Sequence, residues 1–194
     1  MTRPSRTSLV LSAAVWSALV ALLVLAAVTP GHFGDPAAAY RLVAYPLLAL
    51  VLPAVHLLAR TGRPVPAAAT TLVTLPFLID TIGNVADLYA TISWWDDVNH
   101  VSNWLLLSGG IGLALVHTVR PPWALGVLVT GLGSALAVLW ELGEWAWFYS
   151  APYPGTLYED TLGDQVLGTL GALVAGIAVA WLARGAAARS RTGR

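Results

Sequence analysis

The stretch Asp160-Thr-Leu-Gly-Asp164-Gln-Val-Leu-Gly168-Thr-Leu-Gly-Ala172-Leu-Val-Ala-Gly176 decides the fold, because it joins two carboxylates to a long apolar run. Its polar and small residues recur every fourth position and therefore share one face of a helix. Small residues at this spacing let membrane helices pack closely. The stretch predicts a membrane-spanning helix whose acidic face points into a bundle and away from lipid.

The whole sequence has the composition of an integral membrane protein. Of its 194 residues, 57% are hydrophobic and 10% are charged, whereas soluble domains carry about 25% charged residues. Six apolar stretches are long enough for the roughly 20 residues that a spanning helix needs. We predict an all-α integral membrane protein with one domain over residues 1–194 and six spans, near 9–28, 41–59, 66–87, 98–118, 123–147 and 162–183.

The charges divide between the two ends of these spans. All ten positive charges are arginines, and all except Arg41 lie before the first span, in two connections, or at the C-terminal end with its arginine-rich tail at 185–194. Short arginine-bearing segments stay on the cytoplasmic side of a membrane, so both termini are expected to be cytoplasmic. The carboxylates then lie toward the extracytoplasmic side. The net charge of zero argues against a nucleic-acid partner, and the absence of cysteine excludes thiolate metal sites.

Ionisable groups at membrane depth are costly and therefore predict a functional site. Three pairs stand at helical spacing near the extracytoplasmic ends of the spans: Asp97-x-x-His100, Glu141-x-x-Glu144 and Asp160-x-x-x-Asp164. Asp80 reaches a similar height, because it lies roughly 22 Å along the third span at about 1.5 Å per residue. We predict that one pocket in the outer half of the bundle collects Asp80, Asp97, His100, Glu141, Glu144 and Asp164.

Carboxylates crowded into a partly dry space repel one another unless a cation neutralises them. We therefore predict a divalent metal ion, held by Asp97, His100, Glu141, Glu144 and Asp164. Oxygen ligands favour Mg²⁺, Ca²⁺ or Mn²⁺, while the imidazole favours Mn²⁺, Fe²⁺ or Zn²⁺. Asp80 or Asp160 would complete the ligands of the metal or act as the general base, since metal-bound water is a good nucleophile near neutral pH.

Three kinds of protein are compatible with such a site. The first is a metal-dependent enzyme, a hydrolase or transferase, that acts on a lipid-linked or cell-envelope substrate among the membrane lipids. The second is an ion- or proton-coupled transporter, although the inner halves of the spans show no obvious polar route. The third is a non-catalytic envelope-assembly or sensing protein. Asp96 is expected in a solvated loop, and no arginine is expected near the site, so only the metal would hold a substrate phosphate.

The chain resembles a known family in three motifs. They are Trp94-Trp-Asp-Asp97-Val-Asn-His100, Glu141-Leu-Gly-Glu144-Trp and Asp160-Thr-Leu-Gly-Asp164-Gln-Val-Leu-Gly168. Across roughly residues 75–180 it resembles the YjdF-type proteins of the bacterial inner membrane, and more distantly the VanZ-type membrane proteins. The resemblance implies a six-helix protein of the cytoplasmic membrane in which these acidic and histidine positions are the signature. It implies no reaction, and the VanZ likeness hints at cell-envelope biology.

Overall fold

The computed structural model describes residues 6–29, 37–58, 65–147 and 155–192. Every regular element within these ranges is a helix. In chain order they are α1 (Arg6–Val28), α2 (Ala37–Ala49), α3 (Val51–Leu58), α4 (Ala67–Val85), α5 (Leu88–Thr91), α6 (Trp95–Leu115), α7 (Pro122–Trp147) and α8 (Leu157–Thr192). The prediction of an all-α fold is therefore confirmed for the described residues.

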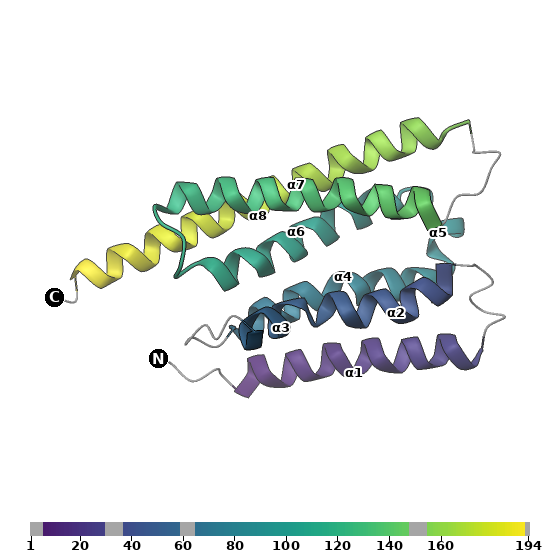
Figure 1. The fold of residues 1–194 in the computed structure, drawn as a ribbon, viewed down its shortest axis with the longest axis horizontal. Coiled ribbons are helices and arrows are strands. Elements are labelled where there is room, and N and C mark those ends of the chain that lie inside the picture. Colours follow the sequence, from purple (N-terminus) through teal and green to yellow (C-terminus); the bar gives the residue numbers. More distant parts are fainter. Residues whose placement is uncertain (1–5, 30–36, 59–64, 148–154, 193–194) are drawn as a thin grey trace.

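The long helices run side by side and form two layers (Figure 1). One layer holds α1, α4 and the α2–α3 pair, and the other holds α6, α7 and α8, with α4 packed against α6 and α8 packed against both α6 and α7. Both termini lie at one end of the bundle. The short helix α5, the start of α6 and the start of α8 lie at the opposite end (Figure 1).

In the part of the chain that the structure describes, four helices have the length and apolar composition to cross a membrane: α1, α4, α7 and α8 over Leu157–Gly185. The predicted second span is divided into α2 and α3. Pro53 has no N–H to donate to the Ala49 carbonyl, and α2 ends at Ala49. The predicted fourth span corresponds to α6, whose first two turns carry Asp96, Asp97, Asn99 and His100.

Glycine and alanine bring α6, α7 and α8 into close contact. A Cβ on Gly171 of α8 would collide with the Val101 carbonyl oxygen of α6, and a Cβ on Gly126 of α7 would lie 3.0 Å from the Gly176 carbonyl oxygen. Asp164, Gly168, Ala172 and Gly176 are all buried, as their four-residue spacing predicts. Asp160, one turn earlier at the start of α8, is exposed.

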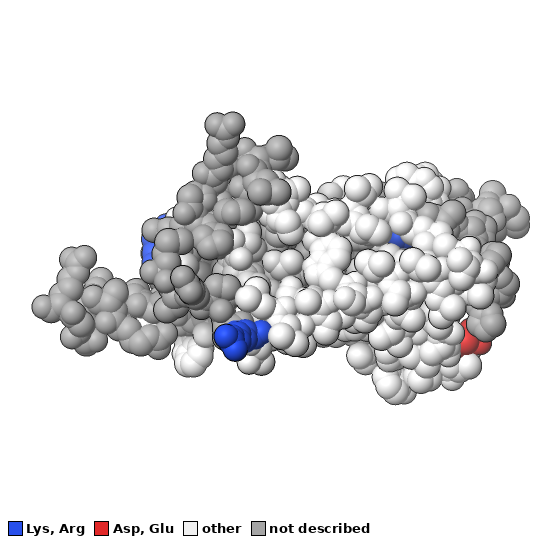
Figure 2. All heavy atoms as spheres, turned by 90° about the horizontal axis from the view of Figure 1, so that it is seen from below, with Lys and Arg blue, Asp and Glu red and all other residues white. Residues whose placement is uncertain are grey.

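The charges differ between the two ends of the bundle. On the face drawn in Figure 2, most of the arginine atoms lie toward the end that carries the termini, and the carboxylate atoms lie toward the opposite end. Several charged residues that supported the predicted topology lie outside the described residues, namely Arg3, Asp35, Arg60, Arg63 and Arg194. The backbone of the predicted tail remains helical to Thr192.

Candidate functional site

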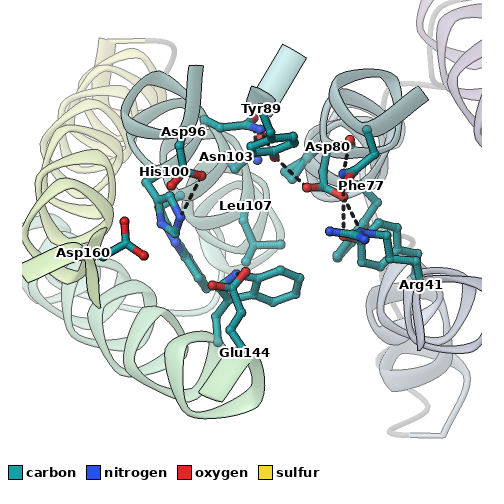
Figure 3. Close-up of a pocket in the computed structure, with 16 residues that line it drawn as sticks. Arg41, Phe77, Asp80, Tyr89, Asp96, His100, Asn103, Leu107, Glu144 and Asp160 are labelled. Atoms are coloured by element: carbon teal, nitrogen blue, oxygen red, sulfur yellow. Dashed lines mark hydrogen bonds and ion pairs between the residues drawn. The ribbon is translucent and has the colours of Figure 1, made fainter. Parts of the chain in front are cut away.

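A polar pocket of about 430 Å³ opens at the end of the bundle opposite the termini, among α2, α4, α5, α6, α7 and α8. Its lining combines charged, amide and aromatic side chains. Figure 3 shows two groups in it: Asp96, His100 and Asp160 on one side, and Arg41, Asp80 and Tyr89 on the other, with Leu107 and Glu144 between them.

His100 is the centre of the first group. Its Nε2 atom lies 3.6 Å from Asp96 Oδ1 and 3.6 Å from Asp164 Oδ1, and its Nδ1 atom lies 3.8 Å from Glu141 Oε1. The side chain is 8% exposed. Nδ1 is buried and makes no hydrogen bond within the described residues. A buried nitrogen without a partner is costly, and the acceptor that faces Nδ1 is Glu141 Oε1.

The three side chains Asp96, His100 and Asp164 can hold a metal ion. One ligand atom from each lies within 4.8 Å of the others. Metal bonds to nitrogen and oxygen are about 2.0–2.2 Å long, which places two ligand atoms of one ion roughly 3–3.5 Å apart. The 3.6 Å separations at Nε2 are close to that spacing. Glu141 faces Nδ1, the other ring nitrogen. In metal sites, a carboxylate in this position commonly orients the histidine ligand.

The second group is a closed hydrogen-bond network around Asp80. Asp80 Oδ2 accepts from Arg41 Nε at 3.1 Å, from Asn84 Nδ2 at 3.2 Å and from the Tyr45 hydroxyl. Asp80 Oδ1 accepts from the Tyr89 hydroxyl at 2.7 Å. Both carboxylate oxygens are thus engaged, and the Arg41 cation offsets the charge. Asp80 is therefore poorly placed to act as a general base.

Tyr89 of α5 extends the Asp80 network to α6. Burial raises the pKa of Tyr89 above its ordinary value, and the negative charge of Asp80 raises this pKa further. The phenol therefore remains protonated at neutral pH, so it can donate to Asp80. Its oxygen accepts from Asn99 Nδ2 of α6, and Asn103 Nδ2 donates to Asn99 Oδ1 at 2.9 Å. The network ties α4, α5 and α6 together beside the His100 cluster.

The structure places only some of the residues predicted for the site in the pocket or next to His100. Asp80, His100, Glu144 and Asp160 line the pocket. Glu141 and Asp164 contact His100. Asp97 is exposed and is not among the residues that line the pocket. Glu144 Oε1 accepts a hydrogen bond from Trp140 Nε1 at 2.9 Å.

Two sequence expectations were wrong. Asp96 lies in the first turn of α6 and not in a loop, because the helix begins at Trp95. Its spacing of four residues from His100 was the signal that could have found it. Arg41 lies in the pocket, although no arginine was expected there. Nothing local in the sequence pairs Arg41 with Asp80, because α2 and α4 meet only through tertiary packing.

The fold and the pocket define an α-helical membrane protein with a buried polar pocket at one end of its bundle. The chain belongs to the family described as "Predicted membrane protein (DUF2238)", whose model matches residues 11–185. This is the family to which the YjdF-type resemblance pointed. No curated protein and no solved structure matches the chain. The VanZ likeness stays a prediction.

Proposed function

We propose that the protein is a metal-dependent enzyme of the bacterial inner membrane, acting on a lipid-linked or cell-envelope substrate at the extracytoplasmic face. In this proposal Asp96, His100 and Asp164 hold a divalent metal ion, and Glu141 orients His100. One observation carries it: a buried histidine faces two carboxylates with one ring nitrogen and a third carboxylate with the other. Paired acids that served only interfacial solvation would not need this arrangement.

The proposed topology has six spans, with both termini in the cytoplasm. The α2–α3 pair acts as one kinked span, and α6 as another. Arg6, Arg120 and Arg184 lie at or near the end of the bundle that carries the termini, as cytoplasmic arginines should. The polar pocket then opens on the extracytoplasmic side, in reach of envelope substrates.

Each group in the pocket has a role in this proposal. A divalent ion would polarise a phosphoryl or carbonyl oxygen of the substrate and lower the pKa of a bound water. Asp160, which is exposed at the pocket wall, can accept a proton from that water because it is open to solvent. Asp80 holds Arg41 in place on the opposite wall, where its guanidinium would donate hydrogen bonds to an oxygen of the substrate.

Ion or proton transport has less support. A transport route needs polar groups that connect the pocket to the other end of the bundle. The hydroxyls of Thr71, Thr74 and Thr81 on α4 donate to their own helix, at 2.9, 2.9 and 2.6 Å. Thr130 and Ser134 on α7 do the same, at 3.0 and 2.9 Å. These hydroxyls donate within their own helices and do not form a chain between helices.

Elemental analysis of detergent-purified protein tests the metal centre. We expect close to one equivalent of a divalent metal in the wild type and almost none in His100→Ala or Asp164→Asn. Less than about half an equivalent of any divalent metal, or equal content in the variants, would contradict the proposal.

Comparison of envelope lipids from cells that overproduce the wild type or His100→Ala tests the proposed enzymatic activity. A lipid whose amount changes only in cells that overproduce the wild type supports catalysis. Identical lipid composition in the two cultures argues for a non-catalytic role.

A further inference from the structure

A second cavity continues the polar pocket into the apolar part of the bundle. It has a volume of about 360 Å³ and lies among α2, α3, α4, α6 and α7. Five residues line both cavities: Phe77, Trp104, Leu107, Trp140 and Glu144. Glu144 is the only charged residue among those lining the second cavity. The two cavities are therefore neighbours with a common wall, one polar and one apolar.

On α4 and α6 the lining changes from polar to apolar along the helix. On α6 the lining passes from His100 through Leu107 to Ile111, and on α4 it passes from Asp80 to Val73. On α7 the apolar lining runs from Trp147 to Leu136, about 16 Å along that helix, and it therefore passes beside Glu144 as well as away from it. A small soluble substrate would gain nothing from this extension. A molecule with a polar head and a hydrocarbon tail matches it.

The groove is open to the surrounding lipid. Leu48 and Val51, on the α2–α3 side, are 38% and 46% exposed, and Leu139 and Trp147 on α7 are 61% and 62% exposed. At Trp140, which lines both cavities, α2 and α7 approach each other, and the ring centroids of Tyr45 and Trp140 are 6.3 Å apart. A bilayer lipid can enter sideways between these helices with its tail parallel to the helix axes, which is the direction it already has in the membrane.

We infer that the substrate class is a membrane phospholipid, with one acyl chain in the apolar groove and its phosphate headgroup in the polar pocket. The identity of the head rests on the proposed function, since a divalent ion and Arg41 are the groups that bind phosphate oxygens. The site of the tail rests on the groove alone. Glu144 lines both cavities and would lie beside the junction between headgroup and acyl chain, and Trp140 donates a hydrogen bond to its carboxylate.

Gly143 offers a direct way to close the groove. It lies in the groove wall, and a Cβ there would meet the Trp147 ring at 3.7 Å, an ordinary contact. Gly143→Leu should therefore fold and fill the groove with its side chain. Gly131→Leu is the matched control on the same helix, because Gly131 is exposed and its Cβ would meet nothing within 4 Å.

The test measures phospholipid retained by the purified protein with native mass spectrometry, beside its metal content. Gly143→Leu should retain about tenfold less phospholipid than the wild type, equivalent to about 1.4 kcal/mol, while Gly131→Leu retains the wild-type amount. Metal content should be equal in all three proteins. Equal lipid retention in Gly143→Leu and Gly131→Leu overturns the inference. If the purified wild type contains phospholipid but no metal, the proposed function is overturned, while the inferred acyl-chain site is still supported.

A second measurement does not depend on any variant. The wild type is placed in phosphatidylglycerol nanodiscs that contain a trace of phospholipid with a diazirine on its acyl chain. Photolysis should label Leu107 and Ile111, which line the groove. Lysophosphatidylglycerol should compete with this labelling, because its single chain and phosphate match the site. Labelling confined to exposed positions such as Val127 and Ile177 would show only the surrounding lipid and overturn the inference.

Discussion

His100 of α6 and Asp164 of α8 face each other across a helix interface, with Nε2 3.6 Å from Oδ1. Both side chains are buried, at 8% and 5% exposure. Such a pair persists at this depth only if charge and hydrogen bonding are balanced by another group. The interface between α6 and α8 therefore combines packing contacts of the bundle with residues of the proposed metal site, and the predictions below separate the two.

Asp96 and Asp97 provide a test at neighbouring positions of one helix. Asp96 belongs to the His100 cluster and Asp97 is exposed. We expect Asp96→Asn to weaken metal affinity about tenfold or more, since changes to the residues that merely orient ligands already cost 10–100-fold. Asp97→Asn should leave the affinity unchanged. Titration with a competing chelator measures both affinities. A larger effect of Asp97→Asn would show that Asp97 is the metal ligand, as the sequence predicted.

Glu141 should act through His100. Its Oε1 atom lies 3.8 Å from His100 Nδ1, so Glu141→Ala removes the carboxylate that orients the imidazole without removing a ligand. We expect metal affinity to fall about 10–100-fold. In Glu141→Gln the affinity should fall less, because the amide oxygen takes the place of the carboxylate oxygen that faces Nδ1. Chelator competition on the two variants is the measurement, and complete metal loss in Glu141→Gln would instead make Glu141 a direct ligand.

Arg41 should stabilise the fold by neutralising Asp80. Both side chains are 12% exposed, and removal of one partner from a buried ion pair costs about 3–5 kcal/mol. Arg41→Met should therefore lower the melting temperature in detergent by several degrees. The double variant Arg41→Met/Asp80→Asn should recover part of the loss, because no uncompensated charge remains. Arg120→Met, at an exposed position, is the control, and an equal loss there would point to a general effect of arginine removal.

Gly171 should control the distance between α6 and α8. A Cβ at this position would lie 2.9 Å from the Leu105 backbone nitrogen and still closer to the Val101 carbonyl oxygen. Gly171→Ala must push the helices apart, at a cost of about 1–3 kcal/mol, and should weaken metal binding by moving Asp164 away from His100. Gly163→Ala, on the same helix with nothing within 4 Å of the added Cβ, should change neither quantity. Thermal unfolding measures the change in stability, and metal titration measures the change in metal affinity. Equal stability of Gly171→Ala and Gly163→Ala would contradict the claim that Gly171 sets the distance between α6 and α8.

The proposed topology can be tested by labelling, since the chain has no cysteine. Glu159→Cys, at the pocket end, should react with a membrane-impermeant maleimide in intact spheroplasts. Arg120→Cys, in the connection between α6 and α7, should react only after permeabilisation. Reaction of both from the same side would disprove the predicted arrangement.

Much of the candidate site follows from local periodicity. The four-residue repeat of Asp164, Gly168 and Ala172 predicted the buried face of α8, and all three residues are buried. The same reasoning placed Glu141 and His100 on inward faces, where both are found. Local periodicity could not choose between Asp96 and Asp97, because residues four and three positions before His100 are both on its side of a helix.

The sequence by itself determined that the chain forms apolar helices and that its arginines and acids favour opposite ends. The first property follows from free energies of transfer into the membrane and the second from the retention of short arginine-bearing segments on the cytoplasmic side, and both can be read from each segment alone. Only the tertiary structure decided that Asp96 joins His100, that Asp97 is left exposed and that Arg41 reaches Asp80. These outcomes depend on how each helix is rotated and placed against its neighbours. That placement is set by small-residue contacts, such as Gly171 against the backbone of α6, between segments that lie far apart in the sequence.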